Sequence, residues 1–113
     1  PVLLINVHLA LGPLARTRQL HYIKKLVHER EHVIVMGDFN ATPHWLMHHS
    51  PLSETSLQPA NMTTPTYPAW RPTKKFDTIF TTPGIKVVHS EILECNYSDH
   101  LPVAVEIVLP VKA

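Results

Sequence analysis

Asp38 and Asn40 stand two residues apart in the stretch Gly37-Asp38-Phe39-Asn40, directly after a short apolar run. A carboxylate at the end of a strand can accept a proton or bind a hard cation, and an amide beside it can donate to an oxyanion. Asp and Asn also form tight turns, and on this local evidence alone a turn is the favoured interpretation.

Asp99 and His100 form a second polar pair, in Ser98-Asp99-His100 before Leu101-Pro102. An Asp and a His at the mouth of a strand can bind a metal and a phosphate respectively, although a polar turn explains the pair equally simply. Asp77 lies inside an otherwise apolar run. If it is buried, it needs a partner, and an imidazole is a natural one; the alternative is a strand-end carboxylate that faces solvent.

The segment His28-Glu29-Arg30-Glu31-His32 fits the H-E-x-x-H pattern of zinc proteases. That chemistry requires both histidines on one face of a continuing helix. Here the pattern falls in the last turn of a predicted helix, and Val33 already begins a strand, so we interpret it as a charged helix terminus. His44 and His48, with His49 beside them, are likewise interpreted as surface residues rather than ligands.

The elements that would position these residues are predicted by hydrophobic periodicity. Residues 2–8 form an apolar strand, residues 14–31 an amphipathic helix that follows Gly12-Pro13, and residues 33–36 a second buried strand. This order predicts a crossover unit, in which polar residues after each strand, such as His8 and Asp38, lie in a plausible place for a site.

The remaining chain is predicted to be a proline-rich irregular segment followed by strands. Residues 41–74 contain six prolines, with one short helical turn expected at residues 45–47. Strands are expected at residues 76–81, 86–93 and 101–109, the last with alternating apolar residues. A long proline-rich loop in a compact domain is more often functional than idle.

Composition narrows the class of protein. The chain has 113 residues, 44% of them hydrophobic, which suits one small domain with a packed core. A net charge of +1 gives no bulk electrostatic argument for nucleic acid, and no apolar run is long enough to span a membrane. The single cysteine, Cys95, excludes an internal disulfide framework and fits a reducing compartment, so a cytoplasmic location is weakly favoured.

Taken in order, three blocks of the chain resemble the endonuclease/exonuclease/phosphatase superfamily, whose members include pancreatic deoxyribonuclease. The first block joins residues 5–9, with Arg16 and Gln19 on the following helix, to residues 35–40. The second covers residues 66–68, 70–72 and 76–79, and the third covers residues 98–102. The resemblance implies that residues 1–113 are the C-terminal half of a four-layer α/β-β/α sandwich, with one mixed, mostly antiparallel sheet and one long helix on one face.

The resemblance also implies roles for the matching residues in a phosphoesterase that depends on Mg²⁺ or Mn²⁺. His100 would contact the scissile phosphate and Asp77 would orient it. Asp38 would position or activate water, and Asn40 would support the transition state. His8 would contact the phosphate, and Asp99 would help to hold the metal. The substrate class stays open among nucleic acids, lipids and small molecules; Arg71, Lys74 and Lys75 would suit a phosphate backbone but equally a solvated loop.

The family's N-terminal half supplies an Asn in a strand and a Glu metal ligand, and neither block is present in this sequence. One half alone would leave an apolar sheet face uncovered, so we expect little hydrolase activity from the isolated chain and expect self-association through that face. The alternative is a non-catalytic binding or scaffold module with the same fold. The residues that precede Pro1 in a parent protein would distinguish the two.

Overall fold

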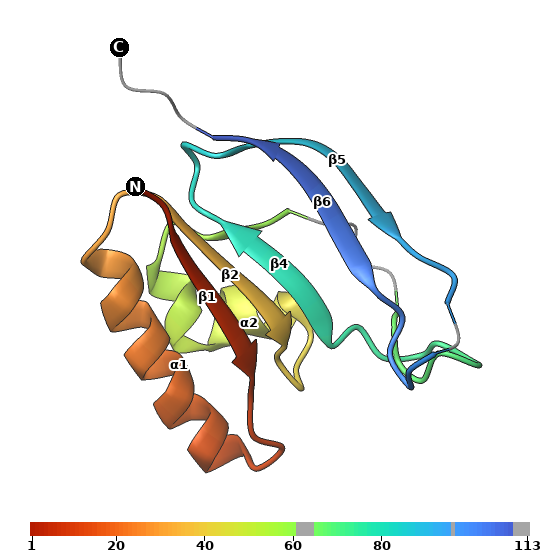
Figure 1. The fold of residues 1–113 in the computed structure, drawn as a ribbon. Helices are drawn as coiled ribbons and strands as arrows, with labels where there is room; N and C mark the ends of the chain where they lie inside the picture. Colours follow the sequence, from red (N-terminus) through yellow and green to blue (C-terminus); the bar gives the residue numbers. More distant parts are fainter. Residues whose placement is uncertain (61–64, 96, 110–113) are drawn as a thin grey trace.

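A strand, a helix and a second strand open the fold, as predicted. The computed structural model describes residues 1–60, 65–95 and 97–109. Strands β1 (Leu3–His8) and β2 (Val33–Asp38) pair in parallel, and α1 (Pro13–His28) connects them across one face of the sheet (Figure 1). The predicted crossover unit is therefore confirmed.

Helix α1 begins where Gly12 and Pro13 stop the preceding loop, and it buries Leu20, Ile23 and Val27. Proline is suited to the first helical turn because its missing N–H would have no partner there. The helix ends at His28, and Val33 begins β2 four residues after Glu29. His28 and His32 therefore do not share a helix, which agrees with the interpretation of this segment as a helix terminus. No helix in the described part of the chain is long and apolar enough to cross a membrane.

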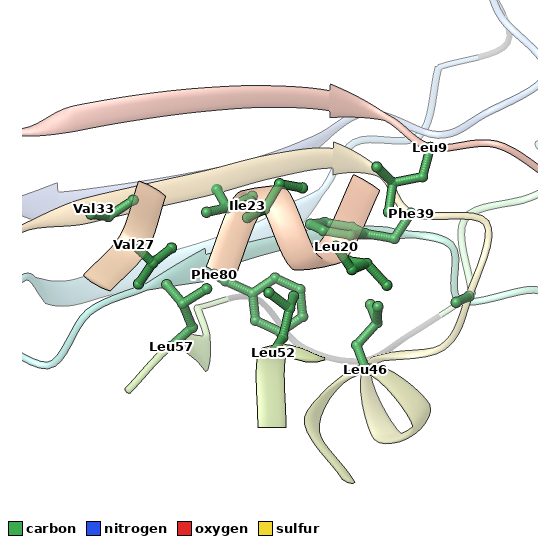
Figure 2. Packing of buried hydrophobic residues seen from close by; sticks show 12 residues of the cluster. Leu9, Leu20, Ile23, Val27, Val33, Phe39, Leu46, Leu52, Leu57 and Phe80 are labelled. Atoms are coloured by element: carbon green, nitrogen blue, oxygen red, sulfur yellow. The ribbon is translucent and has the colours of Figure 1, made fainter. Parts of the chain in front are cut away.

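The main sheet has four strands in the order β1-β2-β4-β3, with β4 (Asp77–Thr81) and the two-residue β3 (Gln58–Pro59) antiparallel to their neighbours. The core lies between this sheet and the helical side of the molecule, and Figure 2 shows its side chains. Phe80 of β4 and Leu20 of α1 are fully buried there. Leu46 and Leu52, which lie between β2 and β3 in the chain, are fully buried in the same core. The ring of Phe39 packs edge-on against Phe80, with centroids 5.1 Å apart.

The mixed α/β fold class is confirmed, but the predictions of a single sheet and of a single helix on its face are wrong. The helical turn expected at residues 45–47 is the seven-residue α2 (Pro43–His49), followed by the short 3-10 helix η1 (Pro51–Glu54), so α1 is not the only helix on its face. The last two strands, β5 (Lys86–Ile92) and β6 (Val103–Val108), pair with each other in a separate two-stranded sheet beside β4 (Figure 1). Residues 61–64 of the proline-rich loop lie outside the described residues.

The sheet face opposite α1 presents its side chains in rows across β1, β2 and β4, because residues paired in register point to the same side. The first row is Leu4, Ile34 and Thr81, the second is Asn6, Met36 and Ile79, and the third is His8, Asp38 and Asp77. The face thus changes from apolar at one end to ionisable at the other. Leu4 is 55% exposed on it.

Candidate active site

His8, Asp38 and Asp77 lie side by side because each ends or begins its strand at the same edge of the sheet. His100 joins them from the far end of the chain. Its Nδ1 lies 2.7 Å from Oδ2 of Asp77, and its Nε2 lies 3.5 Å from Oδ2 of Asp38. Nε2 of the exposed His8 lies 3.7 Å from the same Asp38 oxygen. The structure therefore brings together four residues that the sequence analysis singled out separately.

The loop before β4 fixes the Asp77–His100 pair. The hydroxyl of the fully buried Thr66 donates to Oδ2 of Asp77, the same oxygen that faces His100. The carbonyl of Thr66 accepts from the backbone N–H of Leu101, so one residue holds both partners of the pair. The ring of Tyr67 lies against the His100 imidazole, with centroids 4.5 Å apart.

Sequence reasoning did not assign Thr66 or Tyr67 to the site. Both belong to the block Thr66-Tyr67-Pro68, which carried part of the family resemblance, and that block was the available signal. A threonine in a proline-rich segment has no local pattern that predicts a hydrogen bond to a carboxylate 11 residues further on. Only the fold brings this loop over the end of β4.

The last residues of β2 and the turn after it position Asp38 in the site. Gly37 has a φ of 138°, and a Cβ at this position would overlap the carbonyl oxygen of Val7 in β1. Oδ1 of Asp38 accepts from the backbone N–H of Asn40, which has a φ of 48°. The Asn40 side-chain amide donates to the carbonyl of Leu9 at 2.5 Å. An amide nitrogen carries two hydrogens, so a second N–H remains for a substrate oxygen.

Arg16 and Gln19 of α1 order the loop after β1. Nη1 of Arg16 donates to the Leu11 carbonyl, and the guanidinium lies over the Trp45 ring, 5.3 Å from its centroid. Oε1 of Gln19 accepts from the backbone N–H of Ala10. Both residues lay in the first block of the resemblance, and both act on the backbone that follows His8.

A cavity of about 480 Å³ opens over these residues. Its lining consists mostly of polar and aromatic side chains from distant parts of the chain: His8, Leu11, Asp38, Asn40, Tyr67, Phe76, Asp77, Ser98, Asp99 and His100. Asp99 is exposed at its rim, where its backbone carbonyl accepts from the N–H of Ala69 at 2.7 Å. The candidate residues predicted from sequence therefore all line one cavity: His8, Asp38, Asn40, Asp77, Asp99 and His100.

A model of the Endonuclease/Exonuclease/phosphatase family matches residues 8–100, which begins and ends on two residues of this cavity. The chain belongs to the endonuclease/exonuclease/phosphatase family. The match confirms the resemblance that the three sequence blocks predicted. A search of curated proteins gave no match.

Solved structures of the endonuclease/exonuclease/phosphatase fold resemble the chain over half their length. A family protein from Bacteroides thetaiotaomicron has 24% identity and a TM-score of 0.75, and the match covers 96% of this chain and 50% of that one. A mannosyl-6-phosphatase from Bacteroides thetaiotaomicron VPI-5482 has 23% identity and a TM-score of 0.75, over 94% and 51%. A conserved protein of unknown function from Enterococcus faecalis V583 has 23% identity and a TM-score of 0.74, over 93% and 49%. The chain thus spans about half the length of these structures.

The donor atoms of this family site suit a hard divalent cation. Among the described residues, Asp38, Asp77 and His100 form the one group of three whose possible ligand atoms lie within 4.8 Å of one another. Within this group, Oδ2 of Asp77 already accepts from the Thr66 hydroxyl and lies 2.7 Å from Nδ1 of His100. Mg²⁺ is commonly held by one or two carboxylates together with water and substrate phosphate, and the exposed Asp99 supplies a further carboxylate at the same cavity.

Charge also favours a cation in the cavity. Three carboxylates, those of Asp38, Asp77 and Asp99, line the cavity. Like charges in a partly desolvated site repel one another, and a cationic His100 offsets only part of this repulsion. A divalent cation would remove it.

The imidazole of His100 has a raised pKa. Burial by itself lowers the pKa, but the hydrogen bond from the ring to Asp77 and the charge of that carboxylate act in the opposite direction and dominate. The charges of Asp38 and Asp99 add to the increase, so the pKa lies above the ordinary value of 6.5. The geometry therefore stabilises the protonated, cationic form of His100.

We expect the Cε1 proton signal of His100, followed by NMR, to titrate above pH 6.5, and the midpoint to fall in Asp77→Asn, which removes the main cause of the increase. Because the folded-state pKa is raised, the associated stability is fully present below about pH 6.5 and is lost as the pH rises through the folded value. The slope of unfolding free energy against pH in that window should flatten in His100→Gln. An unchanged midpoint in Asp77→Asn would contradict the assigned pair.

Proposed function

We propose that the chain contributes the phosphate-binding side of a metal-dependent phosphoester hydrolase. The observation that carries the proposal is the position of the His100 ring, hydrogen-bonded to Asp77 and 3.5 Å from Asp38, where these two aspartates lie in register on β2 and β4. Family membership supports hydrolysis as the reaction, and similarity to a mannosyl-6-phosphatase supports a phosphoester as the substrate.

Each side chain has a role that its geometry permits. His100 in its protonated form donates from Nε2 to a non-bridging phosphate oxygen, while Asp77 holds Nδ1 and thereby fixes the orientation of the ring. Asp38 orients a water molecule for attack at phosphorus and accepts its proton. Asn40 and His8 donate to phosphate oxygens as negative charge accumulates on them.

Asp99 would hold Mg²⁺ or Mn²⁺ at the cavity rim, with water, substrate phosphate and ligands from the rest of the domain. The bound cation supplies charge neutralisation for the phosphate and the leaving oxygen. The residues of this chain then bind the phosphate, orient the water and move its proton. These roles need no redox-active ion, because the proposed cation has oxygen ligands and acts only through its charge.

We further propose that the chain is the C-terminal part of a domain about twice as long, since the matched structures extend to about twice its length. The second half would cover the apolar rows of the sheet face, where a cavity of about 360 Å³ separates Met36 and Ile79 from Pro102 and Val103. Without that half, the chain should self-associate through this face. Analytical ultracentrifugation over a rising concentration series tests this: Leu4→Lys should shift the distribution towards monomer, and a wild-type monomer at all concentrations would contradict it.

Hydrolysis of a model phosphodiester and a phosphomonoester tests the proposed activity, using a protein that carries both halves of the domain. We expect turnover with Mg²⁺ or Mn²⁺, none after chelation by EDTA, and recovery on adding the ion back. Asp99→Asn should raise the Mg²⁺ concentration needed for half-maximal rate by about tenfold. The exposed Glu106→Gln on β6 is the matched control and should leave that concentration unchanged. Equal rates with and without EDTA would refute a metal-dependent mechanism.

A further inference from the structure

Helix α2 carries three exposed histidines outside the active-site cavity, His44, His48 and His49. The rings of His44 and His48 lie with centroids 4.5 Å apart and planes inclined by 46°. Residues four apart are neighbours on a helix surface, so this proximity follows from the spacing. The ring of His49 lies 6.1 Å from that of His44. None of these side chains has a part in the proposed hydrolysis.

The backbone that carries the histidines is fixed at both ends. Thr42 caps the start of α2 by accepting from the backbone N–H of Trp45, and the hydroxyl of Ser50 donates to the carbonyl of Leu46 at its end. Leu46 is fully buried and anchors the opposite face of the helix in the core (Figure 2). A ligand that used both His44 and His48 would therefore order two side chains but no backbone, which lowers the entropic cost of binding.

The surroundings restrict which ligand fits. Lys74 and Lys75 line a cavity together with His44, and their positive charge opposes any cation held by charge alone. Hard ions such as Mg²⁺ and Ca²⁺ need oxygen ligands, and no carboxylate lines this cavity among the residues that the structure describes. Zn²⁺, Ni²⁺ and Cu²⁺ instead form strong bonds to neutral imidazole nitrogen.

In contrast to the interpretation of these histidines from sequence as surface residues rather than ligands, we propose that His44 and His48 form a surface site for a borderline transition-metal ion, with Zn²⁺ as the physiological candidate. Two histidines at this spacing on one helix face are an established way of supplying adjacent imidazole ligands to zinc. Both side chains are exposed, so small rotations bring one nitrogen of each ring to a common ion, and water completes the coordination. The site is separate from the hydrolase centre and does not depend on it.

Metal titration of the chain tests the proposal, with the active-site variant His100→Gln examined in parallel. Calorimetry should find a Zn²⁺ site whose affinity falls by about tenfold or more in His44→Gln and in His48→Gln, since each removes a direct ligand. The exposed His21→Gln on α1 is the matched control and should change nothing. Substoichiometric Ni²⁺ should broaden the NMR signals of His44 and His48 before those of His21 and His89. Circular dichroism verifies that each variant is folded.

Three outcomes would overturn the proposal. The first is a Zn²⁺ affinity unchanged within twofold in both α2 variants. The second is Ni²⁺ broadening spread evenly over the exposed histidines. The third is a Zn²⁺ affinity lost only in His100→Gln, which would assign the ion to the hydrolase centre.

Discussion

His100→Gln, in a protein that carries both halves of the domain, should lower kcat for a model phosphodiester by about 10³-fold, the usual loss when a charge-stabilising or proton-handling group is removed. Glutamine keeps a donor near the phosphate but cannot carry the positive charge that Asp77 and Asp38 stabilise on the imidazole. The effect should fall mainly on kcat, because the cationic donor stabilises charge that accumulates in the transition state.

Asp38→Asn should cause a loss of similar size for a different reason. The asparagine preserves the turn, since its side-chain oxygen can still accept from the N–H of Asn40, but it cannot accept a proton from water. His89→Gln is a matched control because His89 is exposed on β5 and its nearest charged partner is Glu91, 3.9 Å away. Full activity in either site variant, with an unchanged circular dichroism spectrum, would remove the basis of the proposed mechanism.

The largest effect on stability is expected from Gly37→Ala. The backbone at this position has a φ of 138°, which an L-residue with a side chain rarely adopts, and the added methyl group would overlap the Val7 carbonyl. Strain of this kind costs about 3 kcal/mol, and displacement of β1 from β2 would add to it. Urea denaturation followed by tryptophan fluorescence should therefore show a much lower midpoint or an unfolded chain.

Gly12→Ala is the control for that measurement. A Cβ at Gly12 meets no atom within 4 Å, and its φ of −69° is ordinary. Its cost should stay below about 1 kcal/mol, because the change affects only a helix cap and the entropy of the unfolded chain. If the two alanine variants unfold at the same urea concentration, the close approach of β1 and β2 at Gly37 is not the constraint we infer.

Much of the fold followed from the sequence because its signals are local. The apolar runs before His8 and Asp38, and the Gly12-Pro13 break between them, give β1, α1 and β2 within a few residues of their observed bounds. The separate pairing of β5 and β6 was not predictable in the same way. Alternation in residues 101–109 identifies a half-buried strand but does not say which strand it joins. The two-residue β3, which contains Pro59, has no periodic signal at all.

The candidate site could likewise be predicted only in part: its residues could be identified from the sequence, but their contacts could not. The sequence identifies each of Asp38, Asp77 and His100 separately as a candidate, because an ionisable residue beside an apolar strand needs a partner or a function. Their contact, by contrast, depends on the docking of a loop and on strand pairing between distant segments. Thr66 was not assigned for this reason, since its hydroxyl has a role only after Asp77 and Leu101 have come to either side of it.

The side chains of His8, Asp38 and Asp77 align only when β1, β2 and β4 pair in their observed register. Because neighbouring side chains of a strand point to opposite faces, a slip of one residue in either pairing would turn one member of the row into the core. The outer members of the row, His8 and Asp77, are 69 positions apart in the sequence, and β4 must dock before the row is complete. Partly folded forms in which β4 has not docked therefore lack this row, and the His100–Asp77 contact should appear during refolding with the long-range pairing of β2 and β4 rather than during early collapse.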